Sequence, residues 1–223
     1  KAIQNGWMTI ILSCTTYVQG GIMTCTANSA LIIIDVQNDF MSWGSLPVSS
    51  AENVIPKINA LQEHYDNIII TQDWHPNNHS SFCEVHGLPE HTVIDMPYGP
   101  QTLWPEHCVE YSYGADLVGE LVQHKAQLII RKGFRVDIDS YSAFYENDHV
   151  TPTGLHGYLQ ERGISDLCFV GVAYDFCVAW SAKDAARLGY KVSVIKDACA
   201  AIDLDGSAEQ ETQAMLSQGI TIL

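Results

Sequence analysis

From Ala30 onward, short apolar runs alternate with longer segments in which apolar and polar positions follow a helical period. The apolar runs have strand length and are rich in β-branched residues, and they lie at 31–34, 68–71, 128–130, 167–172, 191–195 and 220–223. The segments between them predict helices at about 51–64, 116–125, 151–163, 178–188 and 207–218. Almost wholly apolar strands that alternate with helices are typical of a parallel sheet covered on both faces. The pattern therefore predicts an α/β fold: a single doubly wound, Rossmann-like domain with a six-stranded, mostly parallel sheet and helices on both faces.

The chain has 223 residues, which is enough for one sizeable core, and we assign that core to residues 30–223. Residues 1–29 show no helix or strand period and are expected to form a poorly packed N-terminal extension. A secretory signal is disfavoured there, because the apolar stretch at 8–12 is short and polar residues such as Ser13 and Thr15 follow it.

Composition and charge narrow the classes of partner. The formal net charge is −15, which disfavours a surface that follows nucleic-acid phosphates. No apolar run is long enough to span a bilayer, so no membrane partner is expected. The seven cysteines are odd in number and scattered, which favours a reducing compartment over a disulfide framework. We therefore expect a cytoplasmic protein, as a monomer or a homo-oligomer, with a small-molecule substrate.

Polar residues with reactive side chains follow four of the predicted strands. Asp35 follows the first, Asp73 the second, Lys132 the third and Cys177 the fourth. Because doubly wound sheets bind their ligands beyond the carboxyl ends of the strands, these groups should meet at one edge. Each alone could be a solvated loop residue, and Asp35 with Lys132 could be only a structural ion pair.

Cys177 stands where the fourth strand turns directly into a helix. Unpaired backbone amides and the helix dipole at such a turn stabilise a thiolate and a nearby oxyanion. The simpler reading is a small buried apolar thiol. A carboxylate that takes the thiol proton and an ammonium that holds the thiolate would make Asp35, Lys132 and Cys177 a set for covalent acyl transfer.

A second group of residues has the composition of a metal site. Asp73 and His75 are two residues apart in extended chain and therefore face the same way. His107 offers a third ligand from the long irregular segment that follows the predicted strand at 68–71. Three protein ligands leave coordination positions open for water or substrate. These residue types suit one divalent transition-metal ion, with zinc, iron or manganese all possible. His79 could be a fourth ligand or a loop residue that makes hydrogen bonds, and the sequence leaves both open.

Several motifs in order along the chain resemble one family. They are IDVQNDF at 34–40, QDWHPNNH at 72–79, WPEHC at 104–108, KG at 132–133, DSYSAF at 139–144 and GVAYDFC at 171–177. Together they resemble the nicotinamidase/pyrazinamidase branch of the isochorismatase-like hydrolases, from about Ala30 to the C-terminus. Tyr174 and Phe176 depart from the residues that this family often has at the rim of its pocket.

The resemblance implies an amidohydrolase that converts nicotinamide to nicotinate and ammonia through a cysteine thioester in NAD salvage, and that also takes pyrazinamide. It implies a catalytic triad of Asp35, Lys132 and Cys177, and metal ligands Asp73, His75 and His107, with zinc as the expected ion. It further implies a cis peptide between Val172 and Ala173, and an oxyanion hole made by the amides of Ala173 and Cys177. The substrate-binding residues it implies are Phe40, Trp104, Tyr141 and Ala173.

Two other functions remain open at this stage. One is a related hydrolase of another small amide or a carbamoyl group. The other is a non-catalytic protein that binds a small ligand on the same fold, against which the complete set of Asp35, Lys132 and Cys177 argues. Release of ammonia from nicotinamide would separate the three.

Overall fold

The computed structural model describes residues 14–18 and 21–223, and its centre is a six-stranded sheet. The spatial order of the strands is β10 (Thr221–Ile222), β9 (Lys191–Ala200), β8 (Asp166–Val172), β3 (Ser29–Ile34), β4 (Asn67–Asp73) and β7 (Leu128–Lys132). All neighbouring pairs are parallel. The predicted doubly wound α/β fold is confirmed, and each of the six apolar runs forms a strand of this sheet.

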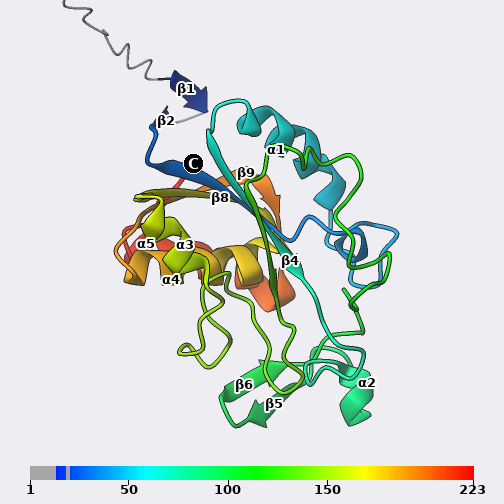
Figure 1. The fold of residues 1–223 in the computed structure, drawn as a ribbon. Coiled ribbons are helices and arrows are strands. Elements are labelled where there is room, and N and C mark those ends of the chain that lie inside the picture. Colours follow the sequence, from blue (N-terminus) through cyan, green and yellow to red (C-terminus); the bar gives the residue numbers. More distant parts are fainter. Residues whose placement is uncertain (1–13, 19–20) are drawn as a thin grey trace, which may run out of the picture.

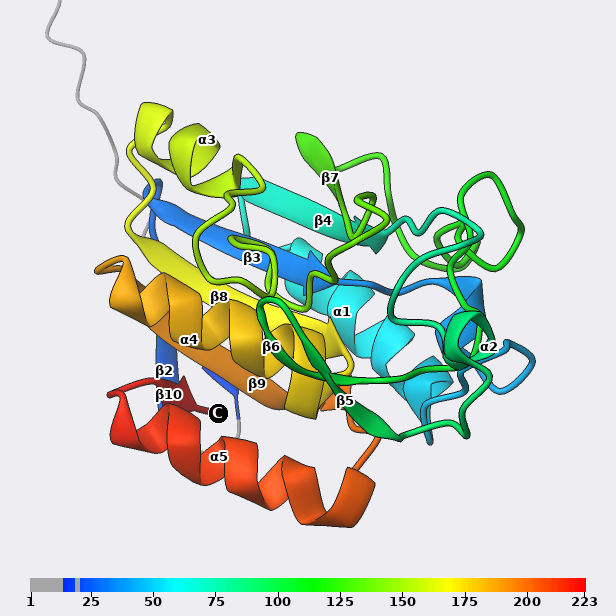
Figure 2. The same cartoon turned by 90° about the horizontal axis from the view of Figure 1, so that it is seen from below.

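Helices cover the two faces of the sheet (Figures 1 and 2). One face packs on α1 (Ile55–Gln62) and the short η2 (Ala51–Val54), and the other on α3 (Leu155–Glu161), α4 (Ala179–Arg187) and α5 (Ser207–Ser217). Successive strand residues enter opposite cores: Ile33 belongs to the α1 side and Ile32 to the α4 side, and both are fully buried. Burial on both faces explains why the strands lack polar alternation.

The edge of the sheet that carries the site follows from the strand order. Strand β4, which follows β3 in the sequence, pairs with one side of β3, and the later strand β8 pairs with the other side. Such a reversal opens a crevice beyond the carboxyl ends of the central strands. Close backbone approach is needed here: Gly171 has φ +116°, and a Cβ at this position would lie 2.1 Å from the Ile34 carbonyl oxygen.

The long segment after β4 lies beyond those strand ends. It contains α2 (Cys83–His86) and an antiparallel hairpin of β5 (Val93–Met96) and β6 (Gly99–Thr102), and η1 (Asn38–Phe40) follows β3 at the same edge. Figure 1 shows β5, β6 and α2 together at one end of the molecule, in the direction in which β4 points. The sequence predicted only irregular structure for this segment.

The predicted helix at 116–125 is wrong, because this segment forms turns. Its backbone groups bond to other parts of the chain: the Val118 amide donates to the Val36 carbonyl, and the Asn59 side chain bonds the Val122 amide and the Glu120 carbonyl. Val118 and Leu121 are nevertheless buried, and Leu117 and Val122 are partly buried, so the periodic pattern identified burial and not helix. The helix predicted at 151–163 is shorter and corresponds to α3.

The structure describes part of the N-terminal segment. Strands β1 (Cys14–Val18) and β2 (Gly21–Cys25) pair as an antiparallel two-stranded sheet, although the sequence showed no strand period there. The remainder of the predicted extension, residues 1–13 and 19–20, lies outside the described residues, so its expected loose packing stays a prediction.

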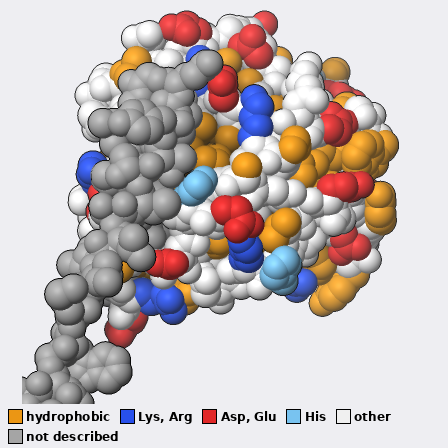
Figure 3. Space-filling model, turned by 90° about the horizontal axis from the view of Figure 1, so that it is seen from above, with side chains coloured by type: hydrophobic (Ala, Val, Ile, Leu, Met, Phe, Trp, Pro, Cys, Tyr) orange, Lys and Arg blue, Asp and Glu red, His pale blue; other side chains and the backbone are white. Residues whose placement is uncertain are grey.

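The surface agrees with the acidic composition. On the face drawn in Figure 3, lysine and arginine side chains lie among acidic and uncharged ones instead of forming a continuous basic field. Within the part of the chain that the structure describes, no helix combines the length and the apolar character needed to cross a membrane.

Candidate active site and metal centre

The predicted strand-end residues meet at the carboxyl edge of the sheet. Asp35 follows β3, Asp73 is the last residue of β4, and Lys132 is the last residue of β7, directly opposite Asp73 in the ladder. Cys177 lies just beyond β8. Because these four strands are neighbours in the sheet, their ends bring the four side chains into one buried cluster.

Lys132 is the centre of this cluster. Its Nζ lies 2.9 Å from Asp35 Oδ2 and 2.5 Å from Asp73 Oδ1, and 3.4 Å from Cys177 Sγ. It also donates to the Ser140 carbonyl at 2.9 Å. Burial by itself lowers the pKa of Lys132, but the two carboxylates outweigh it and raise that pKa well above its usual value. The ammonium therefore stays charged, and it both pairs with the carboxylates and reaches the thiol.

Asp35 is held in place by Thr71 of β4. The Asp35 amide donates to Thr71 Oγ1 at 3.1 Å, and the Thr71 hydroxyl donates to Asp35 Oδ1 at 2.6 Å. The second oxygen of Asp35 stays with Lys132, and one oxygen each of Asp35 and Asp73 lies within 4.8 Å of Cys177 Sγ. Sequence reasoning missed Thr71, whose only signal was a hydroxyl at the end of an apolar strand.

Cys177 lies on η3 (Tyr174–Val178), a π-helical turn that leads into α4. The Val178 amide donates to the Ala173 carbonyl five residues back, at 3.1 Å, and the Val172–Ala173 peptide is cis as the resemblance implied. Single π-turns often occur at functional sites. Burial raises the pKa of the Cys177 thiol well above its usual value, whereas Lys132 lowers it. The resting thiol therefore keeps its proton, so the site needs a base such as Asp35.

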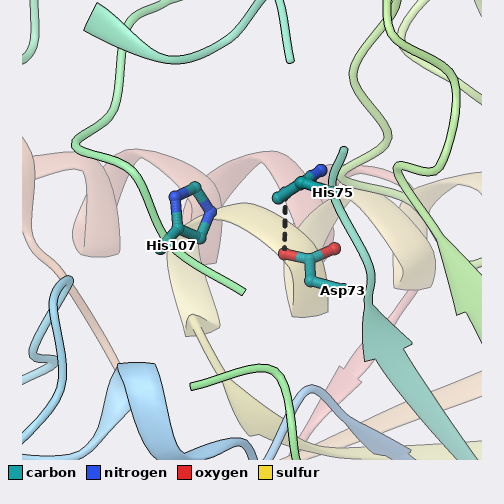
Figure 4. A group of neighbouring side chains, drawn as sticks. All are labelled: Asp73, His75 and His107. Carbon is teal, nitrogen blue, oxygen red and sulfur yellow. Dashed lines mark ion pairs between the residues drawn. The ribbon is translucent and has the colours of Figure 1, made fainter. Parts of the chain in front are cut away.

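Asp73, His75 and His107 form a compact group of potential ligands (Figure 4). One ligand atom from each lies within 4.8 Å of the other two, and His75 Nε2 is 3.8 Å from Asp73 Oδ2. The Nδ1–H of His75 donates to the Gly133 carbonyl and that of His107 to the Pro105 carbonyl, both at 2.8 Å. These bonds leave both Nε2 lone pairs available, which is how proteins orient histidine ligands of metals.

The charge states of these residues also fit a bound cation. Burial lowers the pKa of His75 well below its usual value and also lowers that of His107, so both rings are neutral, as metal ligands must be. Burial raises the pKa of Asp73 although Lys132 lies beside it, and a cation at the second Asp73 oxygen would favour the carboxylate. Two imidazole nitrogens and one carboxylate oxygen suit a divalent transition metal.

The geometry argues against His79 as a fourth ligand. Its Nδ1 accepts from the Ser81 hydroxyl at 2.7 Å, and its Nε2–H donates to the Ile138 carbonyl at 3.2 Å. An oxygen of Asp139 and nitrogens of His75 and His79 do lie within 4.8 Å of one another. Since both ring nitrogens of His79 are already bonded, its ring, 4.3 Å from that of His75, packs beside the ligand group.

A pocket lies beside Cys177 and His107. Its lining includes all four predicted substrate-binding residues, Phe40, Trp104, Tyr141 and Ala173. Leu46, Asp139, Phe176 and Ile202 also line it and were not predicted as substrate-binding residues. A larger hollow at the opposite edge of the sheet, beside Ser29, Cys168 and Thr221, contains none of the triad or ligand residues. We therefore assign the chemistry to the pocket beside Cys177.

The two residues that depart from the family pattern have different positions. Phe176 is part of the pocket wall, with ring centroids 4.9 Å from Trp104 and 5.6 Å from Tyr141 in edge-to-face contacts. Tyr174 is buried away from the rim, and its hydroxyl bonds to that of Thr212 at 2.7 Å. Only Phe176 therefore affects the shape of the pocket directly.

Two glutamines that sequence reasoning did not select hold the site together. Gln37 bonds both backbone groups of Asp73: its Nε2 donates to the Asp73 carbonyl, and its Oε1 accepts from the Asp73 amide, each at 2.8 Å. Gln101 of β6 donates to Asp139 Oδ2 at 2.9 Å and to the Tyr141 hydroxyl at 3.0 Å. Gln37 belongs to a recognised motif, but Gln101 had no signal because its role depends on how the hairpin folds over the pocket.

Comparison with known proteins identifies similar chains over the part of the sequence that forms the sheet and the candidate site. A family model described as the isochorismatase domain matches residues 29–223. A nicotinamidase from Acinetobacter baylyi is 54% identical over 194 residues, which are 86% of this chain and 91% of that protein.

Three solved structures are similar in fold and sequence. The Acinetobacter baumanii nicotinamidase/pyrazinamidase has a TM-score of 0.87 and 52% identity, with 88% of this chain and 96% of that chain covered. PnC1 from L. infantum, in complex with nicotinate, has a TM-score of 0.79 and 38% identity, with 90% and 95% covered. The pyrazinamidase of Pyrococcus horikoshii, in complex with zinc, has a TM-score of 0.71 and 33% identity, with 88% and 98% covered.

Proposed function

The chain belongs to the isochorismatase family, and from this premise we propose that it hydrolyses nicotinamide to nicotinate and ammonia and acts on pyrazinamide in the same way. The similar proteins that carry these activities span nearly the whole of the domain. We place the reaction in the recovery of nicotinamide for NAD synthesis. The catalytic unit is residues 30–223, with residues 1–29 as an extension.

The observation that carries the proposal is the position of Lys132 between two carboxylates and a thiol, at 2.9 Å from Asp35, 2.5 Å from Asp73 and 3.4 Å from Cys177. A purely structural ion pair would not need a cysteine within reach of the ammonium. A protein that only binds a ligand would not need the buried base beside it.

The chemistry starts with proton transfer from Cys177 to Asp35, with Lys132 holding the thiolate that forms. The thiolate attacks the amide carbon, and the amides of Ala173 and Cys177 stabilise the oxyanion, for which one donor is typically worth about 10²–10³ in rate. Asp35 then protonates the leaving amide nitrogen, so that the C–N bond breaks and ammonia departs, a general-acid step worth roughly 10²–10⁴. Asp35 next deprotonates the water that attacks the thioester carbon. The C–S bond then breaks, nicotinate is released, and Cys177 takes the proton back from Asp35.

Asp73, His75 and His107 would hold a divalent metal ion, and zinc is the ion bound in the P. horikoshii relative. A bound ion would supply a Lewis acid for the pyridine nitrogen and would thereby help to orient the ring. Phe40, Trp104 and Tyr141 enclose the ring and exclude water. The carboxamide is thereby presented to Cys177, which supplies the nucleophile itself.

The setting of the enzyme follows from composition. The described cysteines Cys83, Cys108, Cys177 and Cys199 are free thiols, three of them buried, which supports a cytoplasmic, reducing location. The net charge of −15 supports a small uncharged substrate and disfavours phosphate-bearing partners.

Ammonia release from nicotinamide tests the proposal directly. The metal-loaded protein should release stoichiometric ammonia and nicotinate, and Cys177→Ala should abolish turnover while the fold and ring binding persist. A wild-type protein that leaves nicotinamide intact but cleaves another small amide would transfer the assignment to a related amidase. A Cys177→Ala variant with substantial activity would make Cys177 structural.

A further inference from the structure

Asp175 is a buried carboxylate for which the mechanism has no use. It lies on η3, two residues before Cys177, and only 2% of its surface is exposed. Among the side chains that the structure describes, no lysine, arginine or histidine forms an ion pair with it. A buried charge is costly unless hydrogen bonds satisfy it, so the partners of Asp175 indicate what it is for.

All of its side-chain hydrogen-bond partners lie between the end of β9 and the first residue of α5. Asp175 Oδ1 accepts from the Ile202 amide at 3.0 Å, and Oδ2 accepts from the Asp203 amide at 2.7 Å and the Ser207 hydroxyl at 2.5 Å. Hydrogen bonds to an ionised carboxylate are roughly twice as strong as neutral ones. We call residues 202–207 the Ile202 loop; it is anchored to the turn that carries the nucleophile.

The Ile202 loop needs such an anchor. Asp203 and Asp205 both have left-handed backbone, at φ +56° and +52°, and Gly206 follows at +80°. Non-glycine residues in this region persist only where the surroundings hold them. Figure 2 shows that α5 begins, directly after this loop, at the same end of the sheet as α4.

The loop also reaches the substrate pocket. Ile202 lines the pocket together with Phe176 and Cys177, and Phe176 and Cys177 belong to the same π-turn as Asp175. One carboxylate therefore links an apolar wall of the pocket to the turn that presents the sulfur and its flanking amides.

We propose that Asp175 is a positioning residue: it fixes the Ile202 loop to the Cys177 turn, so that Ile202 holds the substrate ring in register with the sulfur. This inference rests on the proposed amide hydrolysis. Loss of the anchor should loosen the wall, which raises KM and, through lost orientation, lowers kcat. A misplacement of the reacting groups by about 1 Å can cost roughly 10²-fold in rate.

Asp175→Asn keeps the size of the side chain but places an NH₂ group against donors. It should lower kcat/KM for nicotinamide by about 10–10²-fold. Ile202→Ala removes the wall and leaves the anchor. If Asp175 acts through Ile202, the double variant Asp175→Asn/Ile202→Ala should lose little more than Ile202→Ala alone, because contacting residues in one pathway are not additive. Asp184→Asn is the matched control, since this buried carboxylate on α4 pairs with Arg187 and not with the Ile202 loop; its kcat/KM should equal that of the wild type.

Rates should be expressed per protein molecule whose Cys177 is reactive, and this fraction is measured by alkylation of the native protein. Unchanged kcat/KM in Asp175→Asn, or fully additive losses in the double variant, would overturn the inference. If Asp175→Asn does not fold, Ser207→Ala replaces it in the same cycle, with a smaller loss and the same non-additivity expected. A wild-type protein without activity on nicotinamide would instead refute the proposed function, so the two failures are distinguishable.

Discussion

Replacement of Lys132 by methionine should damage both the stability and the chemistry of the site. The ammonium is 1% exposed and lies 2.9 Å from Asp35 and 2.5 Å from Asp73. Removal of one partner from a buried ion pair typically costs about 3–5 kcal/mol, because the other charge remains buried. In a domain of this size each kcal/mol lowers Tm by about 2–4 °C, so Lys132→Met should melt about 6–20 °C below the wild type.

The effect on Cys177 can be worked out separately. A unit charge about 4 Å away contributes about 4 kcal/mol at an effective dielectric constant near 20, or roughly three pKa units. The Lys132–Cys177 distance of 3.4 Å is slightly shorter. The thiolate fraction would then fall about 10³-fold, but nucleophilicity rises with pKa with a Brønsted slope near 0.4–0.5. The net expectation is alkylation by a small neutral reagent about 50-fold slower at neutral pH.

The assay follows alkylation of Cys177 by peptide mass spectrometry across pH, with metal content measured for each preparation. The control is Lys132→Met/Asp35→Asn, which restores the net charge of the cluster: it should recover much of the lost Tm but none of the hydrolysis. An alkylation profile that matches the wild type at every pH would refute the reasoning, since Lys132 would then not act on the thiol. Equal Tm values for the two variants would refute the electrostatic account of stability.

The remaining predictions concern the metal and one buried acid. His107→Ala should raise KM for nicotinamide and lower kcat through lost orientation of the substrate. Chelation should lower the rate of hydrolysis, while Cys177 should still react with an alkylating agent. Full activity after exhaustive chelation would contradict the metal's role. His79→Ala should retain more metal than His75→Ala by elemental analysis, because both ring nitrogens of His79 are bonded elsewhere. Burial raises the pKa of Glu146 from 4.5 to about 7 although Arg135 lies 3.2 Å away. The protonated Glu146 carboxyl therefore contributes fully to the stability of the fold below about pH 4.5, and this contribution is lost as pH rises through 7. Glu146→Gln should therefore have a higher free energy of unfolding in urea than the wild type at pH 8, and no such gain near pH 4.5.

The sheet and the strand-end residues could be predicted from the sequence because two simple constraints act on them. A strand buried on both faces must be apolar throughout, as in Leu31–Ile34, and this makes it visible without an alignment. Parallel strands must present their carboxyl ends at one edge, so the sequence alone predicts that Asp35, Lys132 and Cys177 lie together. The register of β4 and β7 then places Lys132 opposite Asp73.

The parts that could not be predicted depend on contacts between distant segments. The pattern at 116–125 indicates burial, and only its bonds to Val36 and Asn59 decide that it forms turns. The ability of His79 to bind a metal depends on whether Ser81 and Ile138 occupy its nitrogens. Such tertiary hydrogen bonds leave no periodic signal, which is why side chains that position the site were missed while the reacting groups were found.

The central claim is a thioester on Cys177 that forms before water enters the reaction. Hydroxylamine tests it, because this nucleophile competes with water for the acyl-enzyme, and the ratio of hydroxamate to nicotinate measures that competition. Nicotinamide and methyl nicotinate would give the same intermediate once their leaving groups depart. We predict the same product ratio from both substrates at each hydroxylamine concentration, and no hydroxamate from Cys177→Ala. A ratio that depends on the leaving group would contradict the account, because each substrate would then be attacked directly.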